Sequence, residues 1–134
     1  MKLMSYNILS DGYIKSQVDS TIKCISVNAR PWIVFDFDYR LGLLRAEIMA
    51  SQSDILCMQE VDHAVKIHEM LDNIGYSSNV GKARQGVDHV TSLVAYKKDK
   101  YELVWQEEVD FKELIKVYEE VRFSVGLVCL FKHK

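Results

Sequence analysis

The residue of this sequence best placed to do chemistry is Glu60, a carboxylate that follows the apolar run of residues 55–58. Because four consecutive apolar residues leave neither face polar, the run predicts a strand inside a sheet that is covered on both sides. Gln59 and Glu60 mark the point where this strand reaches the surface. The carboxyl end of a buried strand is where α/β architectures place ligand and metal groups. This stretch alone leaves a second interpretation open, in which Glu60 caps the next helix or pairs with a lysine.

Asn7 is a second polar side chain near the end of a predicted strand. Residues 2–9 alternate between two faces, which predicts the first strand of the chain. Its amide group would need hydrogen-bond partners if it were buried. We expect the strands that carry Asn7 and Glu60 to be neighbours, so that the two side chains lie close together.

Two amphipathic helices are predicted on either side of the Glu60 strand. Asp38 is expected to cap the first helix and Asp62 the second, which ends where Gly75 supplies a left-handed conformation. The apolar stripe of the first helix consists of Leu41, Leu44 and Ile48, widened by Leu43, Ala46 and Ala50. The stripe of the second consists of Val65, Ile67, Met70, Leu71 and Ile74.

Shorter elements fill the rest of the chain. Residues 90–96 and 101–109 predict a hairpin around the lysine-rich turn at 97–100. The other segments are a turn at 10–12, a long loop or short irregular helices over 13–32, a strand at 76–80, a basic loop at 81–88, a short helix over 110–121 and a buried strand at 125–131.

The composition predicts one domain with a substantial core, since 49% of the 134 residues are hydrophobic. A formal charge of -2 excludes a broadly basic surface that coats nucleic acid. Three widely spaced cysteines, Cys24, Cys57 and Cys129, indicate buried thiols in a reducing compartment, so the cytosol, or the nucleus, is the expected location. No stretch is long and apolar enough to span a membrane, and none has the form of a secretory signal.

The apolar run at 125–131 is followed by only three residues, Lys132, His133 and Lys134. A core strand normally continues into something that covers its faces. We therefore expect the chain to be the first part of a larger domain, in which a second half or a second chain covers the open sheet.

Three segments resemble, in order, the opening motifs of the endonuclease/exonuclease/phosphatase superfamily. They are Met4-Ser5-Tyr6-Asn7-Ile8-Leu9, Phe35-Asp36-Phe37-Asp38-Tyr39-Arg40 and Ser53-Asp54-Ile55-Leu56-Cys57-Met58-Gln59-Glu60-Val61-Asp62. The resemblance is strongest to the carbon-catabolite-repressor branch, which includes deadenylases, nocturnin, angel-like proteins and the 2′,5′-phosphodiesterase. It extends over nearly all of residues 1–134 but matches only the amino-terminal half of that domain. The implied fold is α+β, part of a four-layer α/β/β/α sandwich.

The resemblance implies a Mg²⁺-dependent phosphodiesterase, with Mn²⁺ as a possible substitute, that acts on RNA, most specifically as a 3′–5′ exoribonuclease on poly(A) ends. Such a cation neutralises phosphate charge and orients the attacking water, and it takes oxygen ligands. Glu60 matches the family's principal metal ligand. Asn7 matches its catalytic amide at the metal and phosphate site. Arg40 is expected to form a salt bridge at a helix start rather than a phosphate contact, and Asp62 to cap a helix.

The sequence also departs from the family. The family completes its site with an Asp-x-Asn turn and a late Asp-His pair, which would come after residue 134. The family's Asp-Gly before the hairpin strand is replaced by Val90-Thr91, and none of the four histidines is expected opposite Glu60. We therefore expect the chain alone to be inactive. Two other functions stay open: a non-catalytic binding module, and a phosphatase for small phosphorylated molecules.

Overall fold

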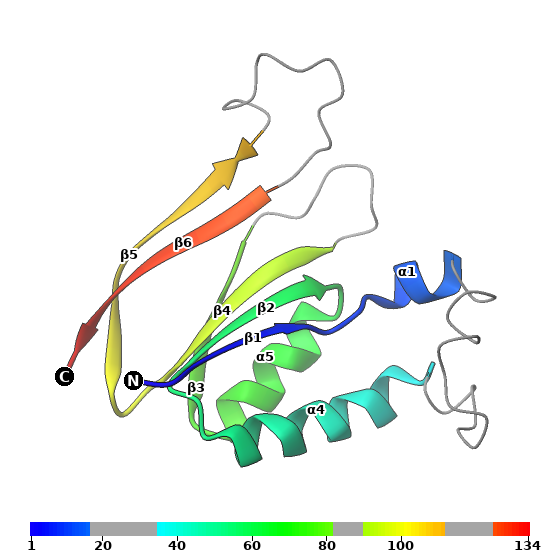
Figure 1. Cartoon of the computed structure of the whole chain (residues 1–134), viewed down its shortest axis with the longest axis horizontal. Coiled ribbons are helices and arrows are strands. Elements are labelled where there is room, and N and C mark those ends of the chain that lie inside the picture. Colours follow the sequence, from blue (N-terminus) through cyan, green and yellow to red (C-terminus); the bar gives the residue numbers. More distant parts are fainter. Residues whose placement is uncertain (17–34, 82–89, 112–124) are drawn as a thin grey trace.

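The computed structural model describes residues 1–16, 35–81, 90–111 and 125–134. Six strands and three helices are described in these ranges (Figure 1). The strands are β1 (Leu3–Asn7), β2 (Ile55–Val61), β3 (Tyr76–Val80), β4 (Thr91–Lys97), β5 (Tyr101–Asp110) and β6 (Val125–His133). The helices are α1 (Asp11–Ser16), α4 (Phe37–Ser51) and α5 (Ala64–Asn73). The strands predicted at 2–9 and 76–80 are confirmed. The segment at 10–12, predicted to be a turn, instead begins α1.

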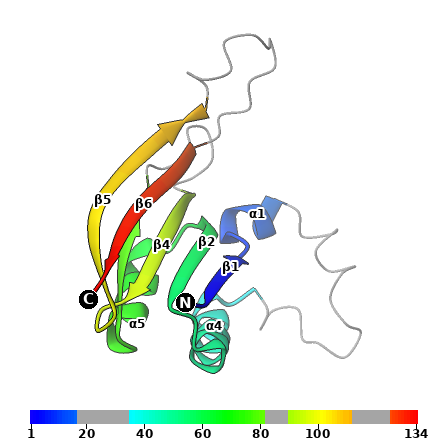
Figure 2. The same cartoon turned by 60° about the vertical axis from the view of Figure 1, so that its left-hand side comes forward.

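A four-stranded sheet with the order β1-β2-β4-β3 forms the centre of the fold. β1 and β2 are parallel, while β4 runs antiparallel to β2 and β3. α4 and α5 cover one face of this sheet, as both views show (Figures 1 and 2). The core lies between the helices and the sheet and includes Leu56 and Met58 of β2, each 1% exposed. The prediction of a buried β2 is therefore confirmed.

The second sheet consists of β5 and β6 and lies on the face of the four-stranded sheet opposite the helices (Figure 2). The rings of Tyr96 and Phe131 pack against each other with centroids 4.8 Å apart. The predicted hairpin of β4 with β5 is wrong, because the lysine-rich turn carries the chain from one sheet to the other. Both edges of β4 are occupied, by β2 and β3, so β5 pairs with β6 instead.

The layers follow the order helix, sheet, sheet, which confirms the α+β class and the partial sandwich. The apolar strand predicted at the end of the chain is present as β6, but it is only half-covered: Val128 and Leu130 are 49% and 56% exposed.

None of the helices in the described ranges is long and apolar enough to cross a membrane. Cys57 and Cys129 are half-buried free thiols whose pKa is raised by burial, and Cys24 lies outside the described residues.

The helices differ from prediction at their starts. The cap of α4 is Asp36, not Asp38: its carboxylate accepts hydrogen bonds from the backbone N–H groups of Asp38 and Tyr39. α5 begins after His63 and has no side-chain cap, so the predicted capping role of Asp62 in that helix is wrong.

The predicted apolar stripes are confirmed at their centres and wrong at their margins. The buried side chains of the two helices are Phe37, Leu44 and Ile48 in α4, and Ile67, Met70 and Leu71 in α5. The side chains of Leu43, Ala46, Ala50 and Val65 are exposed. Gly75 adopts the expected left-handed conformation, with φ of 89°. Most of the segments predicted at 13–32, 81–88 and 110–121 lie outside the described residues.

Candidate active site

Asn7 and Glu60 meet at the carboxyl ends of β1 and β2. The parallel pairing sets Asn7 opposite Gln59, one residue before Glu60. The side-chain Nδ2 of Asn7 donates a hydrogen bond to Oε1 of Glu60 over 2.8 Å. The structure thus brings together the two residues that the sequence selected.

A bulge in β2 turns the Glu60 carboxylate toward Asn7. Leu56 and Met58 point into the core beneath the helices, and simple alternation would send Glu60 the same way. The register instead shifts between Met58 and Val61, and Glu60 adopts a left-handed conformation with φ of 58°. Val61 then returns to the core, fully buried. A non-glycine residue held in this region costs about 1–3 kcal/mol, and such strain clusters at functional sites.

The loop after β1 supplies a second hydrogen bond to Glu60. The backbone N–H of Ser10 donates to Oε2 of Glu60 over 3.3 Å. The backbone N–H of Leu9, which also has a positive φ of 58°, donates to Oδ1 of Asn7 over 2.9 Å. Each Glu60 oxygen therefore accepts one hydrogen bond from the β1 side, which fixes the orientation of the carboxylate.

The remaining acceptor positions of Glu60 are compatible with a hard cation. A carboxylate offers about four lone-pair positions, and the hydrogen bonds from Asn7 and Ser10 use two of them. Within residues 1–16, 35–81, 90–111 and 125–134, no lysine, arginine or histidine forms an ion pair with Glu60. Oxygen atoms on a rigid strand end are the ligands that Mg²⁺ and Mn²⁺ prefer.

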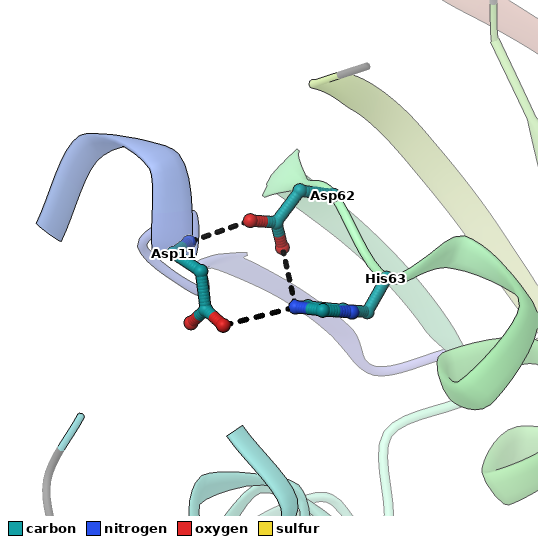
Figure 3. Close-up of side chains that lie close together, drawn as sticks. All are labelled: Asp11, Asp62 and His63. Carbon is teal, nitrogen blue, oxygen red and sulfur yellow. Dashed lines mark hydrogen bonds and ion pairs between the residues drawn. The ribbon is translucent and has the colours of Figure 1, made fainter. Parts of the chain in front are cut away.

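A second polar cluster lies beside this pair and contains Asp11, Asp62 and His63 (Figure 3). One ligand atom of each residue lies within 4.8 Å of the others. Oδ2 of Asp62 accepts a hydrogen bond from the backbone N–H of Asp11 over 2.5 Å, at the first residue of α1. Nε2 of His63 lies 3.0 Å from Oδ2 of Asp11, and the His63 ring stacks on Phe37 with centroids 3.9 Å apart.

This cluster already contains its own counter-charge. Nη1 of Arg40 forms a salt bridge of 2.8 Å with Oδ1 of Asp11, and both side chains are largely buried. Because its Oδ2 accepts from the backbone N–H of Asp11, Asp62 caps α1 rather than α5. The predicted salt bridge of Arg40 is present, and it joins the start of α4 to the start of α1. Arg40 binds Oδ1 of Asp11 and the α1 backbone binds Oδ2 of Asp62, and both contacts are structural. Oδ1 of Asp62 is buried and has no hydrogen-bond partner among the described residues.

Two residues that support the Glu60 carboxylate are not predicted by the sequence. Ser10 acts through its backbone amide, which carries no signal of residue type. The sequence predicts Asp11 in a turn, but a carboxylate in the first turn of a helix is a known preference that also fits this position.

Three of the four histidines lie in the described ranges. Nδ1 of His68 bonds with the Ser78 hydroxyl, His133 packs edge-on against Tyr101, and His89 is not among the described residues. His63 contacts Asp11, not Glu60.

A pocket of about 390 Å³ opens on the α5 side of the cluster. Ala64, Val65 and Val80 form apolar walls, and Lys66 adds a cation. Its size falls in the range of small-molecule sites.

No protein-family model matches the chain, but individual proteins do. The chain is 31% identical over 136 residues to protein angel homolog 2 from Homo sapiens, covering 98% of this chain and 23% of that protein. It is 29% identical over 119 residues to 2′,5′-phosphodiesterase 12 from Mus musculus, covering 87% of this chain and 18% of that protein. It therefore spans less than a quarter of the length of these relatives.

A solved structure is similar over almost the whole chain. The crystal structure of ANGEL2, a 2′,3′-cyclic phosphatase, in complex with adenosine-2′,3′-vanadate has a TM-score of 0.77 and 26% sequence identity. The match covers 99% of this chain and 37% of that chain. These similarities confirm the resemblance that the three sequence motifs carried and the fold class that it implied.

Proposed function

We propose that this chain, which belongs to the endonuclease/exonuclease/phosphatase superfamily, supplies the Glu60 and Asn7 part of an active site that hydrolyses phosphodiester bonds in RNA with the help of Mg²⁺ or Mn²⁺. The proposed reaction is removal of nucleotides from the 3′ end. The names of the relatives support RNA as the substrate class, since a 2′,5′ or 2′,3′ linkage requires the ribose 2′-hydroxyl that DNA lacks. The proposed location is the cytoplasm.

One observation carries this proposal: the Glu60 carboxylate is fixed from one side and has no cationic partner among the described residues. A bound cation would neutralise phosphate charge and orient the attacking water. Glu60 would hold it. Asn7 donates to Glu60 and orients it, and we propose that its amide also contacts the bound phosphate.

We further propose that the rest of the catalytic machinery comes from a larger domain. In the family, an Asp-x-Asn turn and a late Asp-His pair complete the site, and groups that act as a unit lose most of their effect when one is removed. The outer face of β5 and β6 exposes Trp105, Val128 and Leu130, and we propose that the rest of that domain packs there.

Cation binding tests the proposed role of Glu60 directly. Titration of the ¹⁵N-labelled chain with Mn²⁺ should broaden the amide signals of Asn7, Ser10 and Glu60 first, because paramagnetic broadening is strongest near the ion. Glu60→Gln should remove the effect, and Glu69→Gln, which changes an exposed carboxylate on α5, should leave it intact. No broadening at millimolar Mn²⁺, or broadening around Asp11 and His63 that survives Glu60→Gln, would reject the assignment.

A nuclease assay tests the second proposal, that the rest of the catalytic machinery comes from a larger domain. The isolated 134-residue chain should not cleave poly(A) or 2′,5′-linked oligoadenylate. If the reading frame extends past Lys134 into the two missing motifs, the longer protein should cleave one of these substrates in Mg²⁺, and Glu60→Gln should abolish the cleavage. Cleavage by the short chain that depends on Glu60 would show that the site needs no further residues. An inactive longer protein that carries both motifs would favour the binding-module alternative.

A further inference from the structure

We infer that Arg40 is a positioning residue that holds the loop of residues 8–10 against Glu60. Its guanidinium donates to three acceptors at the start of α1. Nη2 donates to the backbone carbonyl of Ile8 over 2.5 Å and to the carbonyl of Leu9. Nη1 donates to Oδ1 of Asp11 over 2.8 Å. One side chain of α4 therefore binds the backbone just before Ser10 and the side chain just after it.

The loop needs such a clamp because its conformation is strained. Leu9 has a positive φ, which a residue with a β-carbon adopts only when its surroundings enforce it. This conformation directs the N–H of Ser10 at Glu60 and the N–H of Leu9 at Asn7. If the carbonyls of Ile8 and Leu9 were released, the loop could relax and both hydrogen bonds would be lost.

The chemistry of arginine suits this role. The guanidinium is planar and always charged and presents five donors in a fixed fork, so it can bind two carbonyls and a carboxylate at once. A lysine in the same place would keep the charge but not the fork. Arg40 is also only 16% exposed and already paired with Asp11, so it is poorly placed to contact a substrate phosphate.

The inference rests on the proposed function, because it assigns Arg40 a task toward the cation at Glu60. It also predicts that loss of Arg40 changes the cation affinity in the direction opposite to that expected from simple electrostatics. Removal of a positive charge near a cation site should strengthen cation binding by Coulomb's law, by a few-fold at most for partly screened charges. Loss of a residue that orients a ligand weakens metal affinity, by roughly 10- to 100-fold for such supporting groups.

The experiment measures Mn²⁺ affinity and, separately, the hydrogen exchange of the Ser10 amide in the metal-free chain. The variants are Arg40→Gln and Arg40→Lys. Arg45→Gln is the matched control, since Arg45 is an exposed arginine on the same helix. Each variant is first checked for native dispersion of its amide spectrum, and Arg40→Lys carries the test if Arg40→Gln does not fold.

Both Arg40 variants should bind Mn²⁺ at least tenfold more weakly and exchange the Ser10 amide at least tenfold faster, while the Arg45→Gln control stays within about threefold of the wild type. Tighter binding in Arg40→Gln, or unchanged binding in Arg40→Lys, would show that Arg40 acts only through its charge and would overturn the inference. If the wild type binds no Mn²⁺, the proposed function fails. The exchange of Ser10 then still decides whether the clamp exists, and unchanged exchange in the Arg40 variants would reject it.

Discussion

The two sheets of this molecule use similar apolar sequences with opposite results. β2 lies between two strands and under two helices, so Leu56 and Met58 are each 1% exposed. β6 is just as apolar, yet among the described strands it pairs with β5 alone and packs one face on the four-stranded sheet, so Leu130 is 56% exposed. An apolar strand sequence therefore predicts that both faces of the strand are buried in the complete domain. Whether they are buried within this part of the chain depends on the neighbouring strands and helices.

The largest expected effect is in the four-stranded sheet. Leu56→Ala or Met58→Ala should lower the free energy of unfolding by roughly 2–5 kcal/mol, because a cavity remains where the side chain was buried. Urea denaturation measures the change. Leu130→Ala in β6 is the matched control and should cost far less. Equal losses at Leu56 and Leu130 would remove the distinction between the two sheets.

A second expected effect concerns the junction of the two sheets at Asp54. Its carboxylate accepts hydrogen bonds from Nζ of Lys100, in the turn between β4 and β5, and from the backbone N–H of Lys2, both over 2.8 Å. The bond to Lys100 is the largest cause of a pKa lowered to about 2, and the Lys2 amide adds to it. An unfolded aspartate has a pKa of about 3.9.

Because the pKa of Asp54 is lower in the folded state, its contribution is complete above about pH 4 and is lost as the pH falls toward 2. The stability difference between the wild type and Asp54→Asn should therefore be constant between about pH 5 and 7 and shrink between about pH 4 and 2. Denaturation midpoints across this range measure it, with the exposed Asp99→Asn as the control. A difference that does not change with pH would mean that the ion pair does not join the sheets.

Much of the first sheet could be predicted from sequence, since its signals are local. The alternation in β1, the apolar run in β2 and the stripes of α4 and α5 each act within a few residues. The pairing of β5 could not be predicted, because the lysine-rich turn after β4 has the sequence of a hairpin. What decides the pairing is that β2 and β3 already occupy both edges of β4, and those contacts are distant in sequence.

The candidate site was also predictable only where its signals are local in sequence. Asn7 and Glu60 could be selected because their residue types and motif positions carry the signal. The bulge at Glu60 and the carbonyls that Arg40 binds could not, since they are properties of the backbone. The capping role of Asp62 was assigned to the wrong helix because α1 and α5 both begin close to it in space, while only α5 is close in sequence.

A smaller effect tests the end of α5. Gly75 has φ of 89°, so Gly75→Ala should lower stability by about 1 kcal/mol, because the added β-carbon disfavours that conformation. Gly42 in α4 is the matched control: a β-carbon there meets nothing within 4 Å, and Gly42→Ala should raise stability by about 0.5–1 kcal/mol. Thermal unfolding compares the two. The same sign at both positions would mean that Gly75 does not need its left-handed conformation.

The smallest expected effect is on the outer face of β6. Leu130→Ser removes a side chain that is more than half exposed, so the free energy of unfolding should change by no more than about 0.5 kcal/mol. Phe131→Ser is the neighbouring control on the inner face, where the ring packs on Tyr96, and it should cost several times more. Because exposed apolar side chains promote contact between molecules, Leu130→Ser should also reduce concentration-dependent association in sedimentation velocity. A loss at Leu130 as large as that at Phe131 would show that the outer face of β6 is already covered within this chain, and no surface would then be left there for the rest of a larger domain.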